Sequence, residues 1–600
     1  MIAVVALLAC SLDPKTTSAD TAVRVDSGAS ATTPGATTEP PTHTSSVTTP
    51  SGTAPDALGD PLGGDGRVDR IHWTAEALRD GLVGSEPVPT EAFALPVAAA
   101  PPTHDVSGTW SLATDPRPAW TTWADLAGLE SYARYRELPA LTFDVSQQGS
   151  HVVPHEHGWQ RTGHAGYDLI LAPGRAWSEQ GDAGATRVAV PFALVEHNGN
   201  CTHDGLLTWL VDDAGPSRVG WQVVQETCLH HKFDAWGATF AEWTPSPAEP
   251  AVTAAWTDEV LNRMPAEPLS DLGLEPDALR AGVDPTDLSA LWVLSEGRLY
   301  ADTPVTRWGV HPFPEVRPLP SFSTAKTLFV GMGAWWLAAE HGDGFRTTPV
   351  SELVPGASVL GDALMVEHLL DMSTGRYHSA VHDEDEAGAT MAAFFAVEAH
   401  REKLAIALTF PRQEPPGSRF VYHTSDSYLA VAALEGWLDR YEPGADLLDR
   451  VWEEVWAPLS ISTLSRASLR ATVEAPDDGQ AYGGYGLWWT TDGVARLAAF
   501  LAQGAPGLTG ADAALQRDPS DPGVPALDGE WRYNDHTWAV RLGPDDGFPC
   551  ERWVPLMSGY GGIAIVFLPS GDVLGVFGDS DAHDWRPGAR ALYDRTPWCP

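Results

Sequence analysis

The pattern of hydrophobic and polar residues divides this 600-residue chain into segments that differ in composition and in apolar periodicity. Residues 10–60 are mostly Ser, Thr, Pro, Ala and Gly and have no apolar periodicity. Such a segment cannot bury enough surface to offset the entropy of ordering its backbone. The pattern therefore predicts a flexible tether over 10–60.

Short apolar runs separated by turn residues follow from 61 to 250. The runs are 142–145, 167–171, 187–190, 206–211 and 220–224, and they are rich in branched and aromatic side chains. Runs of this length and composition between turn signals are typical of strands. We therefore expect a β-rich module over 61–250, whose role the sequence does not reveal.

Helical and strand patterns mix from 251 to 600. Residues 256–263 and 275–281 favour helices, and 290–295 with 298–300 favour a hairpin. Near the end, 562–568 and 573–577 flank the turn Pro-Ser-Gly-Asp, which predicts a strand, a turn and a strand.

The strongest chemical signal is Ser323-Thr324-Ala325-Lys326, which opens the segment STAKTLFVGMGAWWLAAEHG. This segment is apolar nearly all round, which predicts a buried helix with the serine at its N-terminus. Positions i and i+3 share a helix face, so the amine of Lys326 can reach the hydroxyl of Ser323. A serine becomes nucleophilic when a neighbouring base takes its proton, and a buried lysine amine can be that base.

Lysine is scarce in this chain, which contains only Lys15, Lys232, Lys326 and Lys403. A lysine inside an apolar segment is costly unless it has a partner or a task. The alternative interpretation is a helix cap followed by a lysine that extends its amine to solvent.

Several further stretches resemble one family in order and spacing. They are 291–300 (LWVLSEGRLY), Ser323 with Lys326, 348–355 (TPVSELVP), 368–375 (HLLDMSTG), 416–424 (PGSRFVYHT) and 558–562 (SGYGG). Together they resemble the serine hydrolases related to class C β-lactamases, including esterases, D-amino-peptidases and 6-aminohexanoate-dimer hydrolase. The resemblance covers about 251–600.

The resemblance implies an α+β fold over 251–600, a β-lactamase/penicillin-binding-protein-like antiparallel sheet with a helical subdomain. It implies that Ser323 is the nucleophile and that Lys326 and Tyr422 are general base and acid. It places the backbone N–H groups of Ser323 and Tyr560 on the oxyanion. Residues implied around the oxyanion and substrate are Tyr560, Gly559, Ser558 and, weakly, Thr424. No cofactor and no metal is expected.

Two positions depart from the family pattern. Thr424 stands where the family has Asn, and Met557 stands where a Lys or His often opens the last motif. In β-lactamases that cation helps to hold the substrate carboxylate, so its absence favours an ester or amide substrate. The alternatives are D-Ala carboxypeptidase or β-lactamase-type activity, or a catalytically dead binding protein on this scaffold.

The net charge of the chain limits the kinds of partner that it can bind. The chain has 80 acidic and 37 basic residues, a formal net charge of −43. Such a surface repels phosphate backbones, and no basic patch is evident, so nucleic-acid binding is not expected. We expect a small-molecule ester, amide or peptide substrate, and membrane contact only through a lipid anchor.

The first nine residues, MIAVVALLA, resemble the end of a secretory signal peptide. Residues 7–10 (LLAC) resemble a bacterial lipobox, in which Cys10 would be lipidated. No Lys or Arg precedes the apolar run, and an ordinary signal peptide with a chance cysteine is the alternative. Either version predicts an exported protein, a cell-envelope lipoprotein or a secreted one.

Four cysteines remain once Cys10 is set aside. In an exported protein an even set predicts disulfides, and three pairings are possible in principle. Proximity in sequence selects Cys201 with Cys228 and Cys550 with Cys599.

Two sets of polar residues, the histidines of the first module and an acidic run, are expected to lie in loops or at the surface and to have no chemical role. The histidines of the first module include His155-Glu156-His157, which could supply metal ligands, but no spacing matches a known metal signature. We expect loop and surface histidines there. The run Asp383-Glu384-Asp385-Glu386 is expected to be a solvated stretch of charge in a loop.

Overall fold

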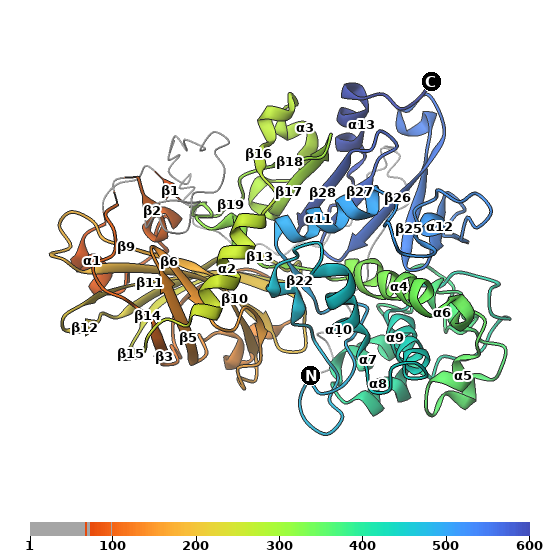
Figure 1. Ribbon diagram of the computed structural model, residues 1–600, viewed down its shortest axis with the longest axis horizontal. Helices are drawn as coiled ribbons and strands as arrows, with labels where there is room; N and C mark the ends of the chain where they lie inside the picture. Colours follow the sequence, from red (N-terminus) through yellow and green to blue (C-terminus); the bar gives the residue numbers. More distant parts are fainter. Residues whose placement is uncertain (1–66, 69–72, 98) are drawn as a thin grey trace, which may run out of the picture.

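Two large β-sheets organise the chain, which is described by a computed structural model over residues 67–68, 73–97 and 99–600 (Figure 1). The predicted signal peptide, lipidation site at Cys10 and tether lie outside the described residues. Within the described ranges, no helix combines the length and apolar character needed to cross a membrane.

The first sheet confirms the expected β-rich module. It has 13 strands, paired antiparallel throughout, in the order β15-β3-β5-β6-β9-β10-β11-β13-β14-β4, with β7, β8 and β12 attached at the side. The strands are β3 (Gly108–Leu112), β4 (Ala119–Asp125), β5 (Leu141–Gln148), β6 (His151–Pro154), β7 (Gly158–Gln160), β8 (Tyr167–Leu171), β9 (Gly174–Trp177), β10 (Thr186–Glu196), β11 (Thr202–Asp212), β12 (Gly215–Pro216), β13 (Val219–Thr227), β14 (His231–Thr239) and β15 (Ala241–Pro245). Each of the five runs read as strands from the sequence falls in one of them.

The second sheet confirms the α+β architecture expected for 251–600. Its nine strands run in the order β16-β18-β17-β28-β27-β26-β25-β24-β23, and only β16 and β18 are parallel. The strands are β16 (Ala266–Pro268), β17 (Leu288–Ser295), β18 (Arg298–Ala301), β23 (Val524–Ala526), β24 (Trp531–Asn534), β25 (Thr537–Leu542), β26 (Arg552–Gly559), β27 (Ile563–Phe567) and β28 (Val573–Gly578). The two hairpins predicted from the sequence are β17–β18 and β27–β28.

Helices cover both faces of this second sheet. One face packs against a helical subdomain, and the other packs against α3 (Pro276–Arg280) and α13 (Arg586–Arg595). The subdomain contains α4 (Met332–His341), α5 (Val350–Leu353), α6 (Val366–Leu370), α7 (Ala389–Ala396), α8 (His400–Ala407), α9 (Thr424–Leu438), α10 (Leu447–Val451), α11 (Thr491–Ala502) and α12 (Ala511–Ala514). In Figure 1 the helices α4–α10 lie below the second sheet and beside the end of the first.

Contacts cross the boundary that the sequence predicts at 250/251. Helix α2 (Pro250–Asn262) begins there and packs on β5 and β6 of the first sheet, where Trp256 and Val260 are buried. The two parts of the chain also share one hydrophobic core. Trp159 of the first sheet stacks on Trp488 of the second part of the chain (251–600), with ring centroids 6.2 Å apart.

Both predicted disulfides are present. Cys201 is bonded to Cys228, and Cys550 is bonded to Cys599. The first lies where β11 begins, at the end of the first sheet that meets the second part of the chain (251–600). The second ties the segment before β26 to the end of the chain.

Candidate active site

A buried helix carries the Ser-x-x-Lys motif, as the sequence predicts. Helical backbone begins directly after Ser323, passes through a π-helical turn over Lys326–Gly331 and continues as α4. Every residue of the turn is buried, while Ser323 at the N-terminus is half-buried. π-Helical turns are rare and are frequent at functional sites. The serine is therefore the accessible end of an otherwise enclosed segment.

The three side chains expected to be catalytic do converge. The Nζ of Lys326 lies 3.0 Å from the Oγ of Ser323, and the hydroxyl of Tyr422 lies 2.9 Å from the same oxygen. Lys326 Nζ is also 4.9 Å from the centroid of the Tyr422 ring. One hydroxyl oxygen thus lies between an amine and a phenol, both within hydrogen-bond distance.

Lys326 does not extend its amine to solvent, so the alternative interpretation of the motif is wrong. Its side chain is 1% exposed. Besides Ser323, its Nζ donates to Thr424 Oγ1 at 2.9 Å and to the carbonyl of Gly484 at 3.1 Å. These three acceptors match the three donors that a lysine ammonium offers. The amine is consequently fixed in direction.

Tyr422 is held from two sides. Its ring stacks on Trp538 of β25, with centroids 5.9 Å apart, and it is 3% exposed. The backbone N–H of the preceding residue, Val421, donates to the carbonyl of Met372 at 2.9 Å. Helix α9 begins two residues after Tyr422, at Thr424. The phenol therefore lies on a short extended segment between the sheet and a helix.

Glu386 is a site residue that sequence reasoning missed. Its two carboxylate oxygens accept from the backbone N–H of Thr424 at 2.8 Å and from its hydroxyl at 2.5 Å. Burial raises the pKa of Glu386, and the positive charge of Lys326 opposes that rise. The expectation of a solvated charge run is thus wrong for Asp385 and Glu386, which are both buried. Nothing in a run of four acidic residues indicates which ones turn inward.

The hydroxyl of Thr424 accepts from Lys326 and donates to Glu386, so it links the amine to the carboxylate. Thr424 therefore lies between Lys326 and Glu386. The weaker expectation that Thr424 also lies near the oxyanion or substrate stays a prediction.

His423 fastens the same segment. It is fully buried between Asp385, whose Oδ2 lies 3.0 Å from His423 Nε2, and Asp426, whose Oδ2 lies 3.5 Å from His423 Nδ1. Burial alone would lower the pKa of His423, but its bonds to the two carboxylates raise it to about 9. A charged imidazole thus ties the 385–386 turn to the N-terminus of α9, on which Tyr422 and Thr424 depend.

The end of β26 lies against the residue that precedes Ser323. The ring of Tyr560 is 5.4 Å from that of Phe322, and a Cβ on Gly559 would come within 3.4 Å of the Cβ of Phe322. The tighter contact of such a Cβ would be with Ile563, at 3.1 Å, so the end of β26 lies in ordinary contact with the segment before Ser323. Ser558 and Met557 are buried beside it. The oxyanion role of the Tyr560 N–H stays a prediction.

The histidines of the first module are not mainly loop and surface residues, which corrects the expectation. His203, His230 and His231 are buried around Glu196, whose carboxylate oxygens lie 3.3, 2.9 and 3.2 Å from their nearest ring nitrogens. Burial opposes ionisation, but the charge of His230 and the bonds of the other two hold the pKa of Glu196 well below its usual range.

Two groups of potential metal ligands occur among the described residues, and both contain Glu196. One adds His203 and His231, whose nitrogens already pair with the carboxylate, and the other adds Cys201, Cys228 and His230. In the second group the cysteines are bonded to each other and offer no thiolate. His155 and His157 bind separate hydroxyls, those of Ser146 and Thr463.

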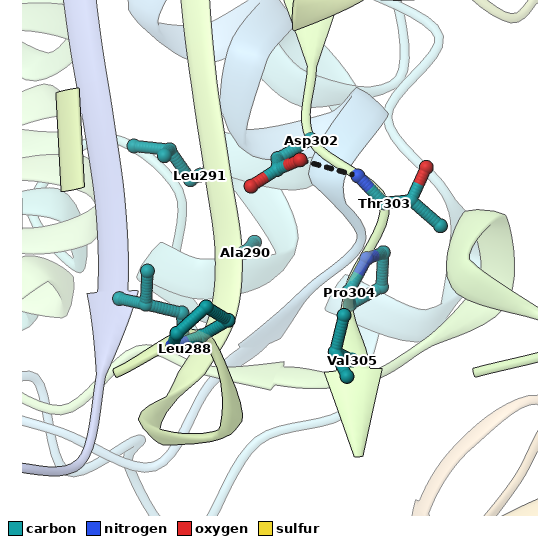
Figure 2. Close-up of a pocket in the computed structure, with 8 residues that line it drawn as sticks. Leu288, Ala290, Leu291, Asp302, Thr303, Pro304 and Val305 are labelled. Carbon is teal, nitrogen blue, oxygen red and sulfur yellow. Dashed lines mark hydrogen bonds between the residues drawn. The ribbon is translucent and has the colours of Figure 1, made fainter. Parts of the chain in front are cut away.

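A small depression elsewhere is no rival site. It lies between the start of β17 and residues 302–305, and its walls are mostly apolar (Figure 2). Its charged residue, Asp302, accepts from Arg280 and from the N–H of Thr303. It holds no nucleophile with a base beside it.

Comparison with known proteins gives remote structural likenesses. No family model and no curated protein matches the chain. A protein described as a 6-aminohexanoate-dimer hydrolase from Bacillus anthracis matches 53% of this chain and 81% of its own, with 16% identity and a TM-score of 0.40. EstCE1, a hydrolase with promiscuous acyltransferase activity, matches 54% of this chain and 98% of its own, with 15% identity and a TM-score of 0.39.

A class C β-lactamase mutant matches 53% of this chain and 97% of its own, with 12% identity and a TM-score of 0.38. These structures are of the classes that the sequence motifs indicate. Similarities this remote leave the reaction to be inferred from the chain's own side chains.

Proposed function

We propose that this protein is a serine hydrolase that cleaves an ester or amide bond through an acyl-enzyme on Ser323. One observation carries the proposal: the half-buried Ser323 hydroxyl lies within hydrogen-bond distance of both Lys326 Nζ and the Tyr422 phenol. A nucleophile and base in reach of each other, with the base held by further groups, is the arrangement that activates a hydroxyl.

In the acylation step, Ser323 Oγ attacks the carbonyl carbon of the substrate and forms a C–O bond. Its proton passes to the Lys326–Tyr422 pair. The backbone N–H groups of Ser323 and Tyr560 are proposed to stabilise the oxyanion, a type of contact worth about 3 kcal/mol per donor. When the tetrahedral intermediate collapses, the bond to the leaving group breaks and Tyr422 donates a proton to that group.

In the deacylation step, a water molecule attacks the acyl carbon. The same pair accepts the proton of the water, and Ser323 regains its own when the C–O bond to it breaks. The acid released is the second product. Because the amine is fixed by Thr424 and Gly484, it needs no large rearrangement between the two steps.

The substrate is proposed to be an ester or an amide without a carboxylate that requires a cation at position 557. Met557 is buried and apolar at that position of β26. D-Ala carboxypeptidase and β-lactamase activities are the alternatives. A peptide ending in D-Ala-D-Ala and nitrocefin test for them.

We further propose that the protein is exported, as a cell-envelope lipoprotein anchored through Cys10 or in secreted form. The two disulfides support this, because disulfides persist in oxidising compartments. Metabolic labelling with a fatty-acid analogue, compared between the natural chain and Cys10→Ala, tests the anchor.

The direct test of the reaction is covalent labelling with a fluorophosphonate probe, followed by peptide mapping, alongside a screen of esters and short amides. We expect a probe adduct on Ser323 and turnover of at least one ester. Ser323→Ala should lose both while its thermal unfolding temperature stays close to that of the natural protein. An adduct on another residue, or turnover that survives Ser323→Ala, would overturn the proposal.

A further inference from the structure

The β10–β11 hairpin of the first module reaches the segment that carries the nucleophile. Its turn contains Asn198, Gly199 and Asn200, and the disulfide at Cys201 follows directly. Asn200 is only 3% exposed. A buried amide needs hydrogen-bond partners, and this one finds all of its partners in the hydrolase-like part of the chain.

The side-chain oxygen of Asn200 accepts from the backbone N–H of Phe322 at 2.7 Å. It also accepts from the hydroxyl of Ser321 and from the N–H of Gly486, each at 3.0 Å. The side-chain nitrogen donates to the carbonyl of Leu487 at 3.1 Å. One side chain therefore joins the residues just before the nucleophile to the 486–487 segment.

Both of these segments determine the catalytic geometry. Phe322 directly precedes Ser323 and has φ = 38°, a left-handed conformation that bulky residues rarely adopt. Such a conformation persists only where its surroundings fix it, and Asn200 supplies an acceptor for its N–H. The 486–487 segment lies two residues beyond Gly484, whose carbonyl accepts from Lys326.

A second loop of the first module supports the opposite side of the site. The ring of His230 lies 5.9 Å from that of Tyr560. A Cβ on Gly561 would come within 3.7 Å of the Cβ of Leu229. The Cys201–Cys228 disulfide joins this loop to the hairpin. The first module thus contacts the residues on both sides of the proposed oxyanion site.

We propose that Asn200 is a positioning residue for Ser323 and that the first module is an integral part of the active site. The inference rests on the proposed function of Ser323. Asn200 acts through Phe322 and the 486–487 segment: it sets the direction of the hydroxyl and of the amine that accepts its proton. This gives residues 61–250 a role in the reaction, separate from substrate binding.

Asn198 is the matched control on the same hairpin. Its side chain also docks on the hydrolase-like part, through the carbonyl of Phe395 at 2.6 Å and the hydroxyl of Tyr482 at 2.7 Å. Neither partner lies in the segment from Ser321 to Lys326. Because Asn198 has φ = 60°, glycine is the replacement that removes its side chain without backbone strain. The two asparagines therefore separate contact with the residues just before Ser323, which Asn200 makes and Asn198 does not, from docking near Gly484.

The experiment compares the natural protein with Asn200→Ala, Asn200→Asp and Asn198→Gly, well below their unfolding temperatures. The readouts are the rate of fluorophosphonate labelling at Ser323, kcat and KM on one ester, and the unfolding temperature. Asn200→Ala should slow labelling and lower kcat by about 10–100-fold, the scale of a small misplacement of reacting atoms, with KM changed less than about threefold. Asn198→Gly should keep both rates within about threefold.

Asn200→Asp retains an acceptor for Phe322 and should lie between the natural protein and Asn200→Ala, so the test survives if the alanine variant does not fold. Labelling and kcat that are equal in the natural protein and in the Asn200 variants overturn the positioning role alone. Absence of labelling at Ser323 in the natural protein overturns the proposed function, and this inference with it.

Discussion

Two buried lysines lie in the same helical subdomain, and among the contacts described only Lys326 has a serine hydroxyl beside it. Lys326 and Lys403 are 1% and 0% exposed. Lys326 donates to two hydroxyls and one carbonyl, and a carboxylate lies beyond one of those hydroxyls. Lys403, on α8, donates to the carbonyl of Phe394 at 3.1 Å.

Aromatic rings surround the amine of Lys403. Its Nζ lies 4.0 Å from the ring centroid of Tyr482 and 4.5 Å from that of Phe394, where cation–π attraction stabilises a charge. Burial nevertheless lowers the pKa of Lys403 to about 7. The comparison teaches that burial can leave a lysine amine partly neutral near pH 7, and so able to accept a proton, without giving it a reaction. The hydroxyl within 3.0 Å distinguishes Lys326.

The largest expected effect separates the two lysines directly. Lys326→Met should lower kcat by about 10³–10⁴-fold, because the proton of Ser323 loses its acceptor. Lys403→Met should keep kcat within about threefold. Steady-state kinetics on one ester checks both variants, and similar losses in the two would remove the distinction.

Tyr422→Phe should lower kcat by about 10²-fold, at the lower end of the range for a general acid. Phenylalanine keeps the stacking on Trp538 but cannot donate to the leaving group. The loss should be larger for an alkyl amide, whose nitrogen must be protonated, than for a nitrophenyl ester, whose leaving group departs as an anion. Equal losses on the two substrates would assign Tyr422 a role other than proton donation.

Substitutions at Thr424 and Glu386 should have smaller effects than those at Lys326 and Tyr422. Thr424→Val removes the hydroxyl that links the amine to Glu386, and we expect kcat to fall by about tenfold. Glu386→Gln keeps the shape and removes the negative charge, which disfavours the protonated form of the base. The acidic limb of the pH–rate profile should therefore move to lower pH. A shift to higher pH, or none, would contradict this electrostatic role.

The last effect concerns stability rather than rate and belongs to Lys403. Its folded pKa of about 7 lies below the ordinary value of 10.5, so the unfolded chain binds the extra proton between these pH values. Stability should rise with pH in this window, by up to about 1.4 kcal/mol per pH unit. Lys403→Met should lose this rise, which unfolding temperatures measured from pH 7 to 10 would detect. A parallel pH dependence in the variant would contradict it.

Local pattern predicted the parts of the site that one helix or one motif contains. Ser323 and Lys326 meet because they are three residues apart on a helix, and Tyr422 was placed by a short motif. The sequence did not predict Glu386 and Asn200 as site residues, because each comes from a turn far away in the chain and reaches the site through tertiary contacts. The composition of a turn does not show how deeply the turn is buried or in which direction its side chains point.

The same limit applies to the fold. Several strands of both sheets follow from their apolar runs, but the other strands, their order and the packing of α2 on the first sheet do not. The buried histidines around Glu196 were expected at the surface, because polar residues near strand ends look alike whether or not another part of the chain covers them.

The stacking of Trp159 on Trp488 also has a consequence for the growing chain. The partner of Trp159 is made roughly 300 residues later, which takes about 15–60 s at typical rates of about 5–20 residues per second. Until then the apolar end of the first sheet has no cover. A chain made and retained in the cytosol should therefore depend on chaperones during that interval, and slowing translation beyond residue 250 should increase aggregation of the nascent polypeptide.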